Sequence, residues 1–382
     1  AKNIEESDVA VTPIAALTYT GGELTPVPVI TYNTRTLEVG EGKDFTVKYS
    51  ANTAAGTATV TVTGIGNYKG SIDVPFTIEK KDIGSGVSFA ASDQTYTGSA
   101  IELQNGDVTA LYVAGEIENV LVLGTDYTIG YAVAGVNYTD VTGAAVAVTV
   151  KGIGNYEGEI ELTFTILAKN IADSDVSFAE IGGLLYTGEA LTPSLSATYN
   201  DKPLVAGEDA DYTAEYGNNK DATQKSGAQA SVTVKGVGNY AGERTLYFTI
   251  ARKSVADKDV SFEVEDVTYT GLAVQLSDAD IAAGYLENDL ALGRDYTIEY
   301  AGDCTNVTEA GITLTIAGIG NYTGETSLTF HILAKSIAAD AEEPVSASVV
   351  GTFTYTGSAI ELLDADIQAT YLTNDLKMGR DY

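Results

Sequence analysis

The stretch GIGNYKG (residues 64–70) has glycines spaced as in a phosphate-binding loop, but the residues on either side predict a β-hairpin. The preceding run GTATVTVT (56–63) is rich in the β-branched residues that favour strands. The following run SIDVPFTI (71–78) alternates apolar and polar residues, which is the period of a strand, whereas a dinucleotide-binding loop opens a helix. We therefore expect these glycines to shape a turn and not to hold a nucleotide.

The same loop returns as GIGNYEG (152–158), GVGNYAG (236–242) and GIGNYTG (318–324), so successive first glycines lie 88, 84 and 82 residues apart. A nucleotide loop is needed once, whereas a hairpin is needed in every copy of a repeated module. We interpret the recurring residues as structural. They are Gly64, Gly66, Asn67, Tyr68, Gly152, Asn155, Tyr156, Gly236, Asn239, Tyr240, Gly318, Asn321 and Tyr322.

Three further markers keep this period: YTG, then DFT or DYT, and a closing FTI or FHI that a lysine follows. The period predicts repeat 1 at 1–80, repeat 2 at 81–168, repeat 3 at 169–252, repeat 4 at 253–334 and a partial repeat 5 at 335–382. Because both ends of the sequence cut through the pattern, we expect the chain to be a segment of a longer array.

Each repeat contains about seven short alternating runs separated by Gly, Asn and Asp, and none has a sustained helical period. The fold class predicted from this pattern is all-β, as a tandem array of immunoglobulin-like β-sandwich modules of about 84 residues. Mostly-β grasp-like modules are the alternative. Of the 24 tyrosines, 22 fall at five positions that recur between repeats, so we interpret them as core residues and not as a sugar-binding platform.

The composition excludes several functions. Asp and Glu number 53 against 21 Lys and Arg, and a net charge of −32 disfavours nucleic acid and anionic membrane surfaces. No apolar run reaches the roughly 18 residues of a membrane span, so we expect no membrane insertion in this segment. The single cysteine, Cys304, would need a histidine partner to act as a nucleophile, and the single histidine, His331, lies in a different strand. We expect no catalytic residues.

Carboxylates follow the lysine that opens most repeats, and clustered carboxylates between modules can hold Ca²⁺. The candidate ligands are Asp8, Asp173, Asp175, Asp257 and Asp259, and a further acidic group lies at 339–343. Repeat 2 breaks the pattern with GSG (84–86), and no EF-hand spacing is present. The alternative is a solvated acidic junction without a metal, and no other cofactor is expected.

The opening lysine and the hairpin asparagine recur in every complete repeat, which raises the possibility of a Lys–Asn cross-link. Such a bond needs a buried apolar site, and the lysines are expected to be exposed at the boundaries. We expect the asparagine to shape its own hairpin by bonding its own backbone.

The succession YTG, LTP, G-x-DYT, GxGNYxG and FTI resembles the tandem immunoglobulin-like or MBG-type repeats of bacterial, often Gram-positive, cell-surface proteins. Repeats 2, 4 and 5 depart from it, with AIEL or AVQL in place of LTP. The resemblance implies an extracellular location, at the bacterial surface or secreted, and usually no catalysis.

Three hypotheses for function follow. The first is a structural stalk or fibre segment that acts as a spacer, on the order of 150 Å long if the modules lie end to end. The second is an adhesin that binds a host glycan or protein through variable loops at 50–56, 132–143, 217–227 and 301–311. The third is an accessory arm of a secreted enzyme. Self-association into fibres is a further interaction that these hypotheses predict.

Overall fold

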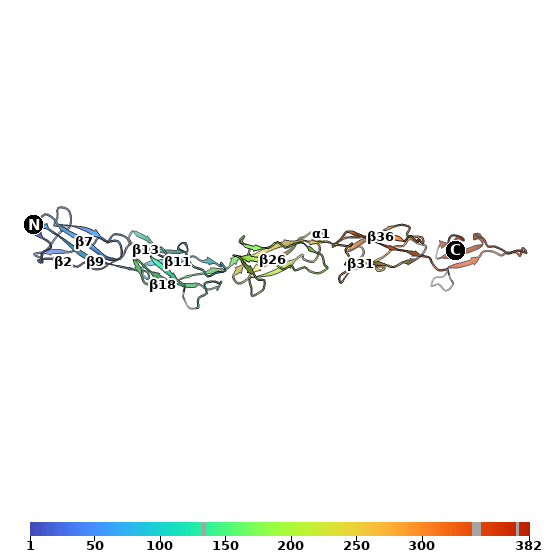
Figure 1. The fold of residues 1–382 in the computed structure, drawn as a ribbon, viewed down its shortest axis with the longest axis horizontal. Helices are drawn as coiled ribbons and strands as arrows, with labels where there is room; N and C mark the ends of the chain where they lie inside the picture. Colours follow the sequence, from blue (N-terminus) through green and yellow to red (C-terminus); the bar gives the residue numbers. More distant parts are fainter. Residues whose placement is uncertain (132–134, 338–344, 372–373) are drawn as a thin grey trace. The chain divides into compact units, whose positions relative to one another are not determined.

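The computed structural model describes residues 1–131, 135–337, 345–371 and 374–382. They form two compact units, the first from Ala1–Phe178, Ser196–Thr213 and Lys235–Arg244, and the second from Ala179–Leu195, Ala214–Val234 and Thr245–Tyr382. We use the predicted repeats as names, so that module 1 is 1–80, module 2 is 81–168, module 3 is 169–252, module 4 is 253–334 and module 5 is 335–382. Nearly all regular elements of both units are strands (Figure 1).

The elements of modules 1 and 2 lie in the first unit. Module 1 has β1 (Lys2–Asn3), β2 (Val9–Val11), β3 (Leu17–Thr18), β4 (Ile30–Tyr32), β5 (Arg35–Thr36), β6 (Phe45–Ser50), β7 (Gly56–Gly64), β8 (Tyr68–Lys69) and β9 (Ser71–Glu79). Module 2 has β10 (Lys81–Asp82), β11 (Val87–Ala91), β12 (Gln94–Thr95), η1 (Asn105–Asp107), β13 (Val108–Ala114), β14 (Ile117–Val120), β15 (Tyr127–Gly130), β16 (Val146–Gly152), β17 (Tyr156–Glu157), β18 (Glu159–Phe164) and β19 (Ile166–Leu167).

Modules 3 and 4 have strands that correspond to those of module 2, with α1 added in module 3, and module 5 has four described elements. Module 3 has β20 (Lys169–Asn170), β21 (Val176–Phe178), β22 (Leu184–Leu185), β23 (Ala197–Tyr199), β24 (Lys202–Leu204), β25 (Tyr212–Gly217), α1 (Thr223–Ser226), β26 (Ala230–Gly236), β27 (Tyr240–Ala241), β28 (Glu243–Phe248) and β29 (Ile250–Ala251). Module 4 has β30 (Lys253–Ser254), β31 (Val260–Val264), β32 (Val267–Thr268), η2 (Asp278–Asp280), β33 (Ile281–Tyr285), β34 (Asn288–Asp289), β35 (Tyr296–Ala301), β36 (Ile312–Gly318), β37 (Tyr322–Thr323), β38 (Glu325–Phe330) and β39 (Ile332–Leu333). Module 5 has β40 (Ser346–Val349), η3 (Asp364–Asp366), β41 (Ile367–Tyr371) and β42 (Asn374–Asp375).

Module 2 illustrates the sandwich. One antiparallel sheet has the order β11-β13-β14 and the other β15-β16-β18, and the short parallel pairs β10-β17 and β12-β19 lie beside them. Alternate residues of β16 enter the core between the sheets, so Val146, Val148 and Val150 are at most 2% exposed. Tyr127 and Phe164 close the same core. Module 4 repeats this arrangement with β31-β33-β34 and β35-β36-β38.

The chain is therefore all-β and built from tandem immunoglobulin-like β-sandwich modules, as the sequence predicted. The grasp-like alternative needs a helix that packs across a sheet. In the described part of the chain the α-helix is confined to the four residues of α1.

Recurring tyrosines fasten loops to this sandwich, in the manner of sandwich corners. The Tyr49 hydroxyl donates to the Pro26 carbonyl at 3.1 Å, and the Tyr300 hydroxyl accepts from the Leu276 amide at 2.7 Å. Both rings are partly buried against the module cores, and a ring with a bonded hydroxyl combines a large apolar contact with a satisfied polar end.

The backbone geometry of the hairpin requires glycine at two positions. A Cβ on Gly152 would lie 2.7 Å from the backbone nitrogen of Glu157, so the two arms of the hairpin approach too closely for a side chain. Gly154 has φ +64°, in the left-handed region that favours glycine. The corresponding glycines of the other three hairpins have the same two properties.

We expect Gly152→Ala to lower the free energy of unfolding of module 2 by roughly 1–3 kcal/mol, because the added methyl group has no space. Hydrogen exchange of the β16 and β18 amides measures this for module 2 alone. Gly106→Ala is the control, because a Cβ there meets nothing within 4 Å, and its effect should stay within about 0.5 kcal/mol. Equal protection of β16 in both variants would contradict the assignment.

Candidate functional site at the module joints

Consecutive modules are joined by a single residue between strands. β9 ends at Glu79 and β10 begins at Lys81, and the same spacing separates β19 from β20 and β29 from β30. We call these contact zones the first joint (modules 1 and 2), the second joint (modules 2 and 3) and the third joint (modules 3 and 4). The residues named below for the first two joints lie in the first unit, and those of the third joint lie in the second unit.

At each joint the tyrosine of YTG packs against the hairpin tyrosine of the next module. The ring centroids of Tyr19 and Tyr156, of Tyr96 and Tyr240, and of Tyr186 and Tyr322 all lie 5.5 Å apart in edge-to-face geometry. Each hairpin tyrosine is also buried within its own module, and this burial raises its pKa. The same ring therefore closes a module and docks it on the preceding one.

Hydrogen bonds to the YTG backbone repeat as well. The hydroxyl of the next module's tyrosine donates to the YTG tyrosine carbonyl, from Tyr112 to Tyr19 (3.2 Å), Tyr199 to Tyr96 (3.1 Å) and Tyr285 to Tyr186 (3.2 Å). An asparagine amide donates to the following threonine carbonyl, from Asn119 to Thr20 (3.0 Å), Asn200 to Thr97 (3.1 Å) and Asn288 to Thr187 (3.4 Å). Each joint is thus held by side chains of one module on backbone atoms of another.

The hairpin asparagine bonds the preceding module, and the expectation that it bonds its own backbone is wrong. The Oδ1 atoms of Asn155, Asn239 and Asn321 accept from the backbone amides of Ala55 (2.9 Å), Val141 (2.7 Å) and Ala222 (2.9 Å). These amides belong to the variable loop of the preceding module. The asparagine can reach them because the turn projects it beyond the edge of its own sandwich.

The second and third joints each contain one further carboxylate, and the sequence analysis predicted neither of them. The Nδ2 atoms of Asn239 and Asn321 each donate at 2.8 Å, to Asp140 and Asp221 respectively. The bond from Asn321 and the ammonium of Lys225 lower the pKa of Asp221. The repeated D-x-T pattern at Asp140 and Asp221, inside loops of otherwise different sequence, is the signal that could have identified them.

The opening lysine is buried, and the expectation of an exposed boundary lysine is wrong for modules 3 and 4. Lys169 and Lys253 are 8% and 4% exposed. Each begins a short parallel strand beside the hairpin, and its ammonium lies over a tyrosine ring, at 5.3 Å from Tyr199 and 5.0 Å from Tyr285. Burial became possible because the ring and two carboxylates replace the water around the charge.

The candidate calcium ligands surround these lysines. Lys253 contacts Asp257 (2.9 Å) and Asp259 (2.7 Å), and Lys169 contacts Asp173 and Asp175, both at 2.8 Å. Asp8 pairs with Lys2 at 2.6 Å. No group of three metal-ligating side chains is found among the described residues, and the acidic run 339–343 lies outside them. The five aspartates stay about half exposed to solvent while they pair with the lysines, so calcium binding and a solvated acidic junction without a metal both stay predictions.

The contacts do not favour a Lys–Asn cross-link either. The ammonium of Lys253 is engaged by two aspartates, while the side chain of Asn321 is engaged by Ala222 and Asp221 of the preceding module. The two groups of one module therefore serve different partners.

A cavity of about 690 Å³ lies between modules 4 and 5. Tyr269 and Tyr371 line it, with ring centroids 6.4 Å apart, close to the 6.5 Å between Tyr96 and Tyr199 at the second joint. Asn306 and Val307 line it from the loop that corresponds to Asp140 and Val141. The far end of module 4 therefore presents its YTG tyrosine and its loop residues to module 5 at the positions that the earlier joints use.

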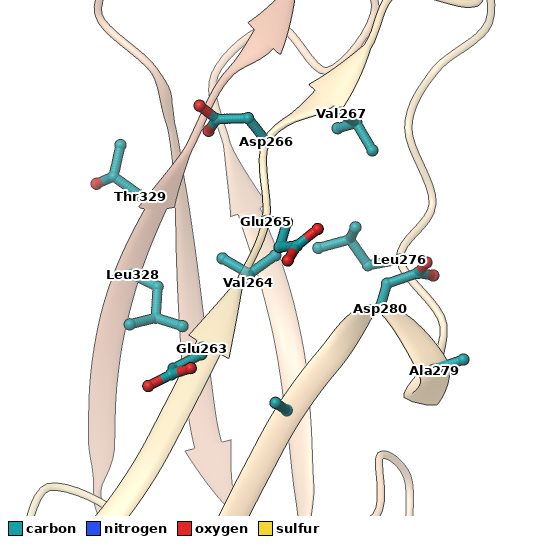
Figure 2. A pocket seen from close by; sticks show the side chains of 11 residues that line it. Glu263, Val264, Glu265, Asp266, Val267, Leu276, Ala279, Asp280, Leu328 and Thr329 are labelled. Carbon is teal, nitrogen blue, oxygen red and sulfur yellow. The ribbon is translucent and has the colours of Figure 1, made fainter.

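Module 4 also has an acidic cavity of about 640 Å³ beside β31 (Figure 2). Two of its four carboxylates are bonded within the module. Asp266 accepts from the backbone amide of His331 at 2.7 Å, and Asp280 accepts from the Ser277 hydroxyl at 2.6 Å. His331 also places Nδ1 at 3.1 Å from Asp266, while Cys304 packs partly buried against the module core.

No family model matches this chain, and no curated protein matches it. Among solved structures it is similar to three multidomain arrays. These are cadherin domains 3–6 of protocadherin gamma B2 (8% identity, 86% of this chain, 100% of that chain, TM-score 0.18), Drosophila N-cadherin EC1–4 (12%, 85%, 99%, 0.21) and the insect immune protein hemolin (10%, 86%, 100%, 0.19). In the described residues no helix is both long and apolar enough to cross a membrane.

We expect the pKa of the Asp259 carboxyl, lowered by its hydrogen bond from Lys253, to return to the ordinary range in Lys253→Met. The contribution of this pair to stability is present above the ordinary aspartate pKa, and it is lost as the pH falls through the lowered value. A carboxyl NMR titration of the native chain and the variant measures the change. Lys258→Met removes an exposed neighbouring charge and is the control. An equal shift in both variants would contradict the pairing.

Proposed function

We propose that this chain is a non-catalytic structural spacer, a stalk or fibre segment of a large bacterial cell-surface or secreted protein with MBG-type repeats. The observation that carries the proposal is the identical 5.5 Å tyrosine contact at three successive joints. A spacer needs each module to contact the preceding module through the same interaction at every joint. The sequence resemblance to bacterial surface repeats supports the extracellular location.

The energies of the joint contacts favour a closed joint. An edge-to-face aromatic pair contributes about 0.5–1.5 kcal/mol, and each net hydrogen bond contributes a similar amount. Every joint combines one such pair with at least three hydrogen bonds between modules. Because a single residue links the strands, little conformational entropy opposes closure. The net charge of −32 repels neighbouring copies and keeps them apart in solution.

The position of the variable loops favours a spacer over an adhesin. Asp140 and Asp221 of two of these loops bond the asparagine of the next module, so part of each loop is occupied by the joint. Residues 132–134 of the loop at 132–143 lie outside the described residues. Host glycan or protein binding, self-association into fibres and an accessory role beside a secreted enzyme stay predictions.

Small-angle X-ray scattering tests the proposal on the full chain. We expect a maximum dimension on the order of 150 Å with the profile of an extended particle. Replacing Tyr19, Tyr96 and Tyr186 together by Ala should lower the radius of gyration, because free joints allow bent arrangements. Tyr247→Ala is the control, since that ring is 60% exposed and is not part of a joint. A native profile that already fits freely jointed modules would overturn the spacer.

A further inference from the structure

The first joint lacks a contact that the second and third joints share. In each of those two, one hairpin asparagine makes two bonds to the preceding loop, accepting from a backbone amide and donating to the aspartate just before it. At the first joint Asn155 accepts from Ala55, but the residue before Ala55 is Ala54, which has no acceptor in its side chain. The position that holds an aspartate in the second and third joints therefore holds an apolar side chain in the first joint.

The lysine of the same joint also lacks its acids. Lys169 and Lys253 are each held over a tyrosine ring by carboxylates four and six residues later. Those positions after Lys81 are Ser85 and Val87. Among the described residues Lys81 has no ion pair, although its ammonium still lies 5.0 Å from the Tyr112 ring. Tyr112 is the residue whose hydroxyl crosses the first joint.

The effect of the missing aspartate follows from hydrogen-bond geometry. An amide held by one bond can turn about that bond, whereas an amide held at both Oδ1 and Nδ2 has one orientation. A bond to an ionised carboxylate is also stronger than a bond between neutral groups. The first joint keeps the aromatic pair and three hydrogen bonds, so it closes, but with a shallower free-energy minimum.

We propose that the first joint is the hinge of this array, and that the residue at the position of Ala54 sets the stiffness of a joint. Aspartate at this position locks the next module, and alanine leaves it free to bend. This inference rests on the proposed spacer function. It adds that, of the first, second and third joints, the first is the compliant one.

Pulsed electron paramagnetic resonance measures the angular freedom of each joint in the full chain. Spin labels are placed in pairs on exposed strand residues of consecutive modules, in a Cys304→Ser background. The labelled positions are Lys48, Thr128, Glu215 and Glu299. The fraction of molecules whose spin–spin distance lies outside the main peak should be about tenfold larger at the first joint than at the second and third joints. This factor is expected for the loss of one charge-assisted hydrogen bond.

Two substitutions test the residue itself. Ala54→Asp should reduce that population at the first joint to the level of the second, and Asp140→Ala should raise it at the second joint about tenfold. Thr53→Asp is the matched control, because it adds the same charge to an exposed neighbour in the same loop. A narrower distance distribution at the first joint in Ala54→Asp supports the inference even if Asp140→Ala disturbs its own loop.

The outcomes separate this inference from the spacer function. Equally narrow distance distributions at all three joints would overturn the hinge proposal and leave the proposed spacer function intact. Three broad distributions would overturn both. A first joint that is broad but responds equally to Ala54→Asp and Thr53→Asp would overturn the role of the residue, since net charge alone would then account for the change.

Discussion

The structure depends on a hairpin whose two arms approach more closely than any side chain allows. With glycine at the first position, the turn brings its tyrosine back into the core of the module and leaves its asparagine at the outer edge. The tyrosine completes one sandwich and packs on the ring of the preceding one. The asparagine bonds the preceding loop. A single local backbone constraint therefore closes each module and also fixes how that module meets its neighbour.

The connection between modules reinforces this arrangement. The strand that ends one module is separated by one residue from the strand that begins the next, and that next strand pairs in parallel with the hairpin. The chain cannot leave a module without contacting the hairpin of its successor. In modules 3 and 4 the first residue of this strand is a buried lysine. The two carboxylates beside it are about half exposed, so water screens the attraction, and their main effect is to hold the ammonium over the tyrosine ring.

The errors of the sequence interpretation have a common origin. A lysine beside acidic residues indicates an exposed lysine at a module boundary when only its neighbours in the sequence are considered as partners. For the same reason, an asparagine in a glycine-rich turn indicates a hydrogen bond to its own backbone. The partners of Asn239 and Asn321 are 98 to 100 residues away in the sequence. Loops of different length carry these partners, so the period of the repeat conceals them.

The sequence by itself determined the all-β class, the hairpin at each Gly-Asn-Tyr motif and the inward-facing residues of the strands. These depend on alternation and on glycine, which act over a few residues. Only the tertiary structure decided what lies on each side of a joint: which amide the asparagine accepts from, which aspartate it donates to, and that a charged lysine is buried on a tyrosine ring. Those contacts exist only once two folded sandwiches meet at a joint, because one module supplies the donors and acceptors that the next one bonds.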